Sequence, residues 1–303
     1  MIIESGEHTT LGNSPFKSEA WLQGLNTSFR IYKAISSNKE VASIALNFIT
    51  LSKAGVLKIN TLATPMWALD CGLSPDISSE TFLDLLGRVS NEKAALKVID
   101  LPPSINADLI KSSEKLGYKV KWRHTRQLEL PSNLTGNRRK QLRRAAKEGI
   151  VGAESNSALD DVIRLHKKSR DRKNIHHDGN SFETLLQSIS SLKDFFMITV
   201  SNTEGELMAS GGFLVIDNKT CLYAFGGQMR SKNSGLASVV LIDEAIKVAE
   251  KRGCTVFDFG GSQDKGVDDF YKGFGADAVP KARLVKASWW LNPILTIVRP
   301  DLA

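Results

Sequence analysis

The chain has 303 residues, of which 42% are hydrophobic and 24% are charged; this is the composition of a globular protein and excludes a disordered or fibrous chain. It carries 40 Lys and Arg against 33 Asp and Glu, and residues 121–150 alone hold nine basic and two acidic residues, so 9 − 2 = +7 accounts for the whole surplus. Since the remaining residues are balanced, the charge argues against a general nucleic-acid or membrane coat, whose basic residues would spread over a whole surface.

The length allows one large domain or two ordinary ones, because single cores stop growing at about 250–300 residues. The first residues, MIIESGEHTT, lack a basic and an apolar region, and no stretch reaches about 18 apolar residues, so we expect neither a signal peptide nor a transmembrane helix. The three cysteines, Cys71, Cys221 and Cys254, lack metal-ligand spacing. They predict buried thiols in a cytoplasmic protein without a metal site.

Two halves of the chain repeat one construction. In the first half, β-rich segments at 29–35 and 41–49 flank a tight turn, and a helix over 106–115 precedes a strand that ends at Leu130. In the second half, strands are expected at 196–201, 207–216 and 221–228, and a helix over 267–272 precedes a strand at 283–287. A repeat of this length indicates duplicated domains. We therefore predict two tandem α/β domains with mixed sheets, residues 1–130 and 131–303.

The basic surplus continues from the last strand of the first half into a helix predicted over 135–148. Gly149 ends this helix, and most of its surface is cationic: Arg138, Arg139, Lys140, Arg143, Arg144 and Lys147. It is either a solvated helix or a phosphate-binding helix at the domain boundary. A helix that binds RNA or DNA is the third possibility, because no aromatic residue interrupts the run to stack on bases.

A second phosphate site is predicted where the strand 221–228 leads through a polar loop into a helix over 237–251. The loop has the spacing Lys232-x-x-Gly235-x-Ala237, and the helix N-terminus offers unpaired N–H groups and the positive end of the helix dipole. The simpler alternative is a plain strand-to-helix turn.

Two side chains that could carry a proton follow this helix. Asp258 stands in the apolar run CTVFDFGG, so its carboxylate is either paired or lies at a cleft with a raised pKa, where it could act as a base. Tyr271 lies on the short helix 267–272 and is either a proton donor or an aromatic residue that covers the sheet.

These motifs resemble those of the GNAT acyltransferase superfamily. Lys232-x-x-Gly235-x-Ala237 is similar to its pyrophosphate loop, and Phe270-Tyr271-Lys272-Gly273-Phe274 to its FYxxxGF ending. The basic helix, Phe257–Ser262, and Leu165-His166 followed by Asp178-Gly179 further resemble the duplicated FemAB-like or BioF2-like branch. The resemblance covers about residues 20–290.

The resemblance implies an acyl-CoA donor, acetyl-CoA or a longer acyl-CoA, in the second half. The expected donor-binding residues are Gln228, Arg230, Lys232, Asn233, Ser234, Gly235, Leu236 and Ala237. Tyr271 would protonate the leaving thiolate, Asp258 would deprotonate the acceptor, and His166 is the second candidate for that base. Fem-type enzymes, which use aminoacyl-tRNA, typically have Lys where this chain has Tyr271, so the tyrosine favours acyl-CoA.

The first half lacks a glycine phosphate loop and would be a degenerate GNAT-like domain that supports acceptor binding. The expected acceptor-binding residues are Trp67, Arg139, Arg143, His176 and His177. The two adjacent histidines lack a third spaced ligand for a metal. The predicted function is acyl transfer to an amine or hydroxyl of a sugar, polysaccharide or cell-envelope precursor.

Two alternatives remain open: a Fem-type transferase dependent on aminoacyl-tRNA, and a non-catalytic protein that binds an anionic polymer or RNA. The apolar C-terminal segment 288–298 either closes the core or contacts a membrane surface, which would bring the enzyme to a lipid-linked acceptor.

Overall fold

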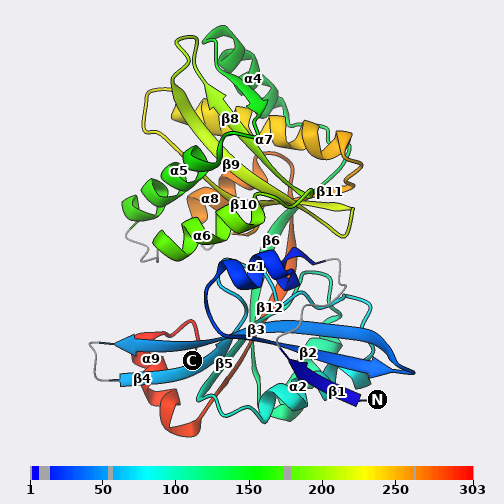
Figure 1. Cartoon of the computed structure of the whole chain (residues 1–303). Helices are drawn as coiled ribbons and strands as arrows, with labels where there is room; N and C mark the ends of the chain where they lie inside the picture. Colours follow the sequence, from blue (N-terminus) through cyan, green and yellow to red (C-terminus); the bar gives the residue numbers. More distant parts are fainter. Residues whose placement is uncertain (1, 7–13, 54–56, 174–178, 262–263, 303) are drawn as a thin grey trace. The chain divides into compact units, whose positions relative to one another are not determined.

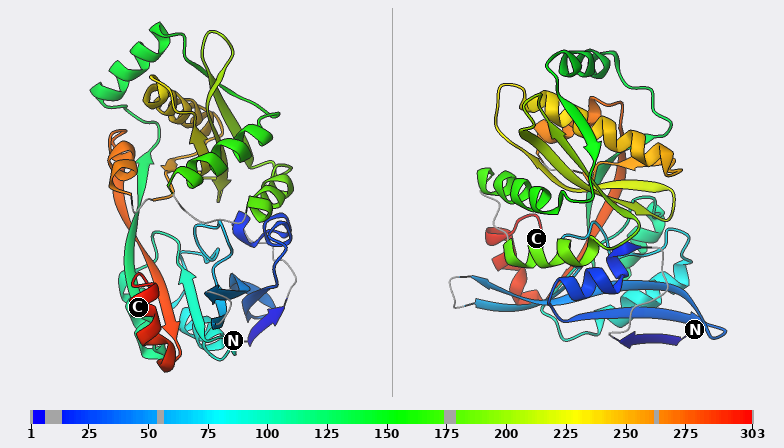
Figure 2. Two further views of the ribbon diagram at one scale, coloured as in Figure 1. Left: turned by 90° about the vertical axis from the view of Figure 1, so that its left-hand side faces the viewer. Right: turned by 45° about the horizontal axis from the view of Figure 1, so that its top comes forward.

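The computed structural model describes residues 2–6, 14–53, 57–173, 179–261 and 264–302 (Figures 1 and 2). The chain forms two compact units, Met1–His124 with Val279–Ala303, and Thr125–Ala278. The sequence placed the C-terminal segment in the second half, but the structure assigns it to the first unit. Strands β6 (Lys119–Glu129) and β12 (Asp277–Ala287) each contain residues of both units, and hydrophobic periodicity does not show which sheet such a strand joins.

The first unit has a mixed sheet. Strands β1 (Ile2–Gly6), β2 (Phe29–Ser36), β3 (Lys39–Lys53) and β4 (Leu57–Ala63) are antiparallel neighbours. Strand β5 (Leu96–Asp100) pairs parallel with β4 and antiparallel with β12. The helices are η1 (Pro15–Lys17), α1 (Glu19–Gly24), α2 (Ser79–Ser90), α3 (Ala107–Ser112), η2 (Ser113–Leu116), η3 (Trp289–Leu291) and α9 (Asn292–Val298).

Both faces of this sheet are covered, which explains why all five residues of β5 are buried. Leu96 and Val98 belong to an apolar cluster with Leu291 and Leu295 of the C-terminal segment. Ile99 points to the other face and packs with residues of α2 and α3. One face of η3 and α9 therefore closes the core of the first unit. This is one of the two alternatives that the sequence predicted for this segment.

The second unit also has a mixed sheet. The end of β6 pairs antiparallel with β11 (Val256–Asp258), which lies parallel to β10 (Thr220–Gln228). Strands β9 (Leu207–Ile216), β8 (Phe195–Ser201) and β7 (Val151–Glu154) continue it as antiparallel neighbours. The helices are α4 (Gly136–Lys147), α5 (Leu159–Arg172), α6 (Gly179–Ile189), α7 (Ser234–Lys251) and α8 (Lys265–Lys272).

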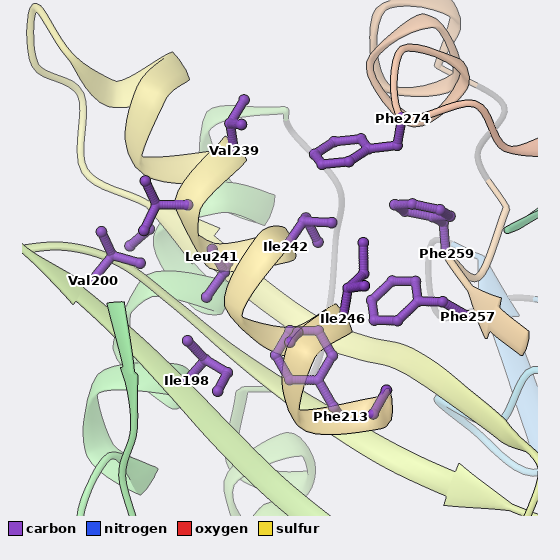
Figure 3. Packing of buried hydrophobic residues seen from close by; sticks show 14 of the residues in the cluster. Ile198, Val200, Phe213, Val239, Leu241, Ile242, Ile246, Phe257, Phe259 and Phe274 are labelled. Carbon is purple, nitrogen blue, oxygen red and sulfur yellow. The ribbon is translucent and has the colours of Figure 1, made fainter. Parts of the chain in front are cut away.

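Helix α7 forms the centre of the second core. The buried stripe predicted from its sequence is confirmed, and Figure 3 shows Ile242 and Ile246 of α7 close to Phe257 and Phe259. The mixed α/β class and most of the predicted elements are likewise confirmed, with boundaries shifted by a few residues. No helix in the described part of the chain is long and apolar enough to cross a membrane.

Candidate active site

The site begins where two parallel strands separate. β10 pairs with β11 only over Thr220–Leu222, although it continues to Gln228. A cavity of about 540 Å³ lies beside the free part of β10. Its walls come from the end of α5, the end of β10, the start of α7, and α8. The lining residues are Ser169, Arg172, Lys173, Tyr223, Gly226, Gly227, Gln228, Arg230, Gly235, Ser238, Leu241, Ile242, Gly261, Gly266, Val267, Phe270 and Tyr271.

The corresponding strands of the first unit, β4 and β5, stay joined beyond their ladder. Thr64 N–H donates to the Val98 carbonyl at 2.9 Å, and Asp100 N–H donates to Thr64 Oγ1 at 2.7 Å. Cys71 N–H then donates to the Asp100 carbonyl at 2.9 Å. The segment after β4 therefore occupies in the first unit the place where β10 and β11 separate in the second unit.

The N-terminus of α7 opens onto the cavity. Gly235, in the first turn, lines it together with Arg230 and Gln228. A Cβ atom on Gly235 would meet nothing within 4 Å, and its N–H has no backbone acceptor within the described residues. An unpaired N–H at the positive end of an 18-residue helix, beside an arginine, favours an anion.

Three of the eight predicted donor-binding residues thus line the cavity: Gln228, Arg230 and Gly235. The side chains of Leu236 and Ala237 are buried in the core. Asn233 Nδ2 donates to Glu148 Oε2 at 3.2 Å. Lys232 is exposed, and neither it nor Ser234 is among the lining residues.

Tyr271 lies in the cavity wall, on the α8 face that packs against the core. Its side chain is buried beside Phe259, with ring centroids 4.8 Å apart. Burial, then the neighbouring Tyr223 and Asp258, raises the pKa of Tyr271 well above its usual range. The described residues provide no hydrogen-bond partner for its hydroxyl. The phenol therefore stays protonated and can donate a hydrogen bond into the cavity.

Asp258 has the paired environment that was one of its two expected states. Its carboxylate accepts hydrogen bonds from Thr125 Oγ1, from Gln127 Nε2 at 2.8 Å and from Gly260 N–H at 2.7 Å. It is buried and is not among the described residues that line the cavity. These contacts fix the turn after β11, which has positive φ at Gly260 and Gly261, and they leave the carboxylate poorly placed to take a proton from an acceptor.

His166 faces β10 rather than the cavity. Its Nδ1 accepts a long hydrogen bond, 3.4 Å, from Gly226 N–H. The ring stacks on Phe182 at 4.3 Å and meets Phe225 edge-on at 5.9 Å. The helix backbone approaches β10 so closely here that a Cβ atom on Gly227 would collide with the Leu165 carbonyl. The geometry therefore supports a packing role for His166.

The predicted acceptor residues belong to different units, and none of the described ones lines the cavity. Trp67 belongs to the first unit and has a left-handed backbone, with φ of 66°. Arg139 and Arg143 are exposed on α4, outside the cavity wall. His176 and His177 lie outside the described residues.

Helix α5 contributes two cationic cavity residues that were not predicted from the sequence. Arg172 and Lys173, at its C-terminal end, line the cavity. Arg172 donates to the Gln228 carbonyl at 3.1 Å, and Lys173 pairs with Asp264 at 2.7 Å. With Arg230 they make three cations and no acidic side chain among the described lining residues. The sequence shows that α5 ends in basic residues, but only the fold shows that this end lies beside β10.

The basic helix α4 is less uniform than its sequence suggested. Arg138 is only 5% exposed, and its guanidinium lies over the rings of Phe270 and Phe274, at 4.5 and 4.4 Å from their centroids. It also donates to the Phe270 carbonyl and, at 2.6 Å, to Gln141 Oε1. Burial lowers the pKa of Arg138. This arginine joins α4 to α8, whereas the other five basic residues of α4 are exposed.

The described residues contain no group of three or more His, Cys, Asp or Glu side chains that could hold a metal ion. The polar groups that the described cavity wall does offer include Tyr271, the backbone of β10, three cations and the N-terminus of α7.

A fold of this kind, with parallel strands that separate beside a helix N-terminus, defines a class of acyltransferases. The family model for the acetyltransferase (GNAT) domain matches residues 132–273. These residues are a GNAT domain, and the protein is an acyltransferase by class. A comparison with curated proteins gave no significant match.

Solved structures show the same fold over the whole chain. The crystal structure of FemX is 14% identical, with a TM-score of 0.72, and the match covers 97% of this chain and 99% of that one. The structure of L-PGS from Bacillus licheniformis is 14% identical, with a TM-score of 0.56 and coverages of 95% and 98%. A tandem GNAT protein from the clavulanic acid biosynthesis pathway is 8% identical, with a TM-score of 0.54 and coverages of 94% and 98%. These matches show that the whole chain has the fold of those structures.

Proposed function

We propose that this protein transfers an acetyl or longer acyl group from CoA to an amine or hydroxyl of a sugar, polysaccharide or cell-envelope precursor. The observation that carries the proposal is the cavity of about 540 Å³, which combines the α7 N-terminus, the free part of β10 and Tyr271 in one GNAT domain. Three buried cysteines and a donor of this kind support a cytoplasmic location.

The donor would lie along β10. Its diphosphate would bind at Gly235 N–H and Arg230, and its pantetheine arm would follow Gln228 toward Tyr223. Backbone N–H groups alternate in direction along an antiparallel strand. Met229 N–H points to β9, where it donates to Met208, so those of Gly226 and Gln228 point away from β9. The Gly226 N–H donates to His166 Nδ1, so the Gln228 N–H is the candidate to stabilise the oxyanion of the thioester carbonyl.

In the reaction, the acceptor nitrogen or oxygen attacks the thioester carbon, the new bond to that carbon forms, and the carbon–sulfur bond breaks. The acceptor loses one proton and the departing sulfur gains one. Tyr271 would donate a hydrogen bond to this sulfur, because its pKa is too high for the phenol to ionise. We assign Asp258 to fixing the Gly260 turn. An amine acceptor would then enter as its free base, since the described cavity wall has no carboxylate or imidazole.

Donor binding tests the proposal directly. Acetyl-CoA at about 100 times its Kd should stabilise the protein by about 2.7 kcal/mol in thermal unfolding. Gly235→Glu should abolish this shift, because it places a carboxylate where the diphosphate binds. Ser191→Glu adds the same charge at an exposed position outside the cavity and should keep it. No stabilisation of the wild-type protein by any acyl-CoA would refute the donor.

A second candidate donor is aminoacyl-tRNA, as in the Fem-type alternative. The observation that favours it is the row of exposed cations on α4, which suits a polyanion. The same assay separates the two donors. Stabilisation by charged tRNA and not by acyl-CoA would select the second.

We also infer that the C-terminal segment contacts a membrane surface, which would supply a lipid-linked acceptor. Trp289, Trp290 and Ile297 are 85, 41 and 84% exposed, although Leu291 and Leu295 on the same segment are buried. Indole rings favour the headgroup region of a bilayer. Trp289→Ser should reduce co-flotation with anionic vesicles, while Val151→Ser, at an apolar position 61% exposed in the second unit, should not. Equal flotation of both variants would refute this contact.

A further inference from the structure

Helix α4 carries a charge pattern that works against its own stability. Five of its exposed side chains are cationic, and none forms an ion pair within the described part of the chain: Arg139, Lys140, Arg143, Arg144 and Lys147. Like charges four residues apart destabilise a helix, and the helix has three such pairs, 139/143, 140/144 and 143/147. Its first turn has no acidic residue to offset the helix dipole. A bound anion would relieve this repulsion.

The last turn of α4 lies at the N-terminus of α7. Glu148, the residue that caps α4, accepts a hydrogen bond from Asn233, which caps α7, at 3.2 Å. Arg144 is four residues before Glu148 and so shares its side of the helix. Lys147 is the neighbour of Glu148, and Lys232 is the neighbour of Asn233. The two helices also pack together, since Leu142 and Ala145 of α4 contact the core around α7.

This contact joins the exposed cations of α4 to the proposed diphosphate site. The loop from Arg230 to Gly235 has cavity-lining residues at both ends, and Asn233 within it touches α4. In CoA, the adenosine ribose that follows the diphosphate carries a 3′-phosphate monoester with almost two negative charges at neutral pH. A donor whose diphosphate sits at Gly235 therefore has a second group, of similar charge, within reach of the α4 end.

We propose that Arg144 and Lys147 bind the 3′-phosphate of the donor, so that α4 selects CoA over the same molecule without this phosphate. The inference rests on the proposed function, because it requires the diphosphate at Gly235. It assigns the basic helix to one small anionic group at its C-terminal end, with Lys232 beside that group. The alternative, a polyanion lying along the whole helix, would use Arg139 and Lys140 equally.

The test compares acetyl-CoA with 3′-dephospho-acetyl-CoA by calorimetry. Wild-type protein should bind acetyl-CoA roughly tenfold more tightly, as expected for two partly exposed charge-assisted contacts, and salt should reduce the ratio. The double variant Arg144→Ala/Lys147→Ala should lose the ratio and keep its affinity for the dephospho compound. Lys140→Ala removes one positive charge a turn away from Arg144 and should keep the ratio within about twofold.

The outcomes separate the two proposals. Equal affinity of the wild-type protein for both compounds would overturn the 3′-phosphate site and leave the CoA donor standing. So would a double variant that weakens both compounds equally. A loss with Lys140→Ala as large as with the double variant, together with competition by duplex RNA, would make the helix a polyanion surface instead. Binding of neither compound would refute the proposed donor, and the 3′-phosphate site with it.

Discussion

At the scale of single residues, Tyr271 is the side chain on which the proposed chemistry depends. Tyr271 lines the cavity, and its ring is held against Phe259. Because burial raises its pKa above the ordinary value of about 10, the hydrogen bond that it donates should persist into alkaline solution. Tyr223, whose pKa burial raises to about 12, is the second phenol in the cavity wall.

Tyr271→Phe should lower kcat roughly 100-fold and change the KM for acyl-CoA little, since the hydroxyl meets the sulfur only as the carbon–sulfur bond breaks. The wild-type kcat should not decline up to about pH 10, because the raised pKa keeps the phenol protonated. Tyr223→Phe is the matched control and should cost less than tenfold. Two results would contradict the role of Tyr271 as a hydrogen-bond donor. One is a wild-type kcat that declines below pH 9 and no longer does so in Tyr271→Phe, and the other is an equal loss of kcat in both variants.

Sequence patterns identified Tyr271 and Gly235 because each stands in a local motif with a readable spacing. They left Asp258 between two states, since an apolar run shows that a carboxylate is buried and not what it bonds to. Its partner Gln127 is 131 residues away in the sequence, and only the pairing of β6 with β11 brings the two together. For the same reason the sequence did not predict that Arg172 and Lys173 line the cavity, because basic residues are common at the C-terminal end of a helix.

At the scale of elements, α8 is the short helix that holds Tyr271 in place. Asp264 caps its first turn, and the hydrogen bond from Lys173 lowers the pKa of that carboxyl. In the middle, Arg126 forms two hydrogen bonds, 2.8 and 2.6 Å, with Asp268. At its end, Arg138 of α4 donates to the Phe270 carbonyl. An eight-residue helix is marginal alone, so these contacts and core packing set its position.

Arg138→Met should therefore destabilise the protein by about 1–3 kcal/mol, because the Phe270 carbonyl and Gln141 lose their donor and two rings lose a cation. It should lower kcat more than donor affinity, since α8 moves and α7 does not. Arg139→Met, the exposed neighbour, is the matched control and should change neither. Chemical denaturation and steady-state kinetics of both variants measure this, and indistinguishable variants would show that Arg138 does not position α8.

The periodicity of α4 predicted its length and its cationic surface but not the buried arginine. A helix with six basic residues is expected to be solvated on most sides. The burial of Arg138 depends on two aromatic rings more than 130 positions further along the chain. A Cβ atom on Gly273 would lie 2.5 Å from the Arg138 guanidinium, so a side chain there would displace that group.

At the scale of the whole molecule, the chain is a duplication in which one unit keeps an open site and the other closes it. The repeat was readable from turns and strand patterns, and the GNAT class from motifs. The assignment of residues 279–303 to the first unit was not, because it depends on Arg283 pairing with Asp100 at 2.7 Å and on Leu291 and Leu295 filling a core made by β5.

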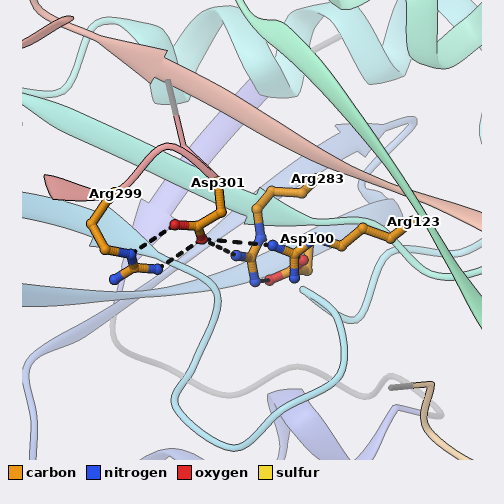
Figure 4. Close-up of polar contacts among 5 residues, drawn as sticks. All are labelled: Asp100, Arg123, Arg283, Arg299 and Asp301. Carbon is orange, nitrogen blue, oxygen red and sulfur yellow. Dashed lines mark hydrogen bonds and ion pairs between the residues drawn. The ribbon is translucent and has the colours of Figure 1, made fainter. Parts of the chain in front are cut away.

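Asp301 fastens the end of this C-terminal segment to the first unit (Figure 4). It forms two hydrogen bonds with Arg299 and lies 3.8 Å from Arg123 and 4.0 Å from Arg283. The hydrogen bonds from Arg299, followed by the charges of Arg299 and Arg283, lower the pKa of Asp301. A carboxyl with a lowered pKa stabilises the folded state above its unfolded pKa of about 4, and this contribution disappears as the pH falls through the folded value.

Asp301→Asn should therefore cost about 1 kcal/mol or less at pH 7, a small amount because the side chain is 43% exposed and solvent screens the pairs. The cost should shrink as the pH falls below about 4 and vanish once the pH is below the lowered folded pKa of Asp301. Hydrogen exchange should quicken in α9 and the end of β12, and the acyl-CoA shift of the second unit should be unchanged. Asp76→Asn, at an exposed position of the first unit, is the control. A pH-independent difference between the variants would mean that Asp301 acts through packing and not through its charge.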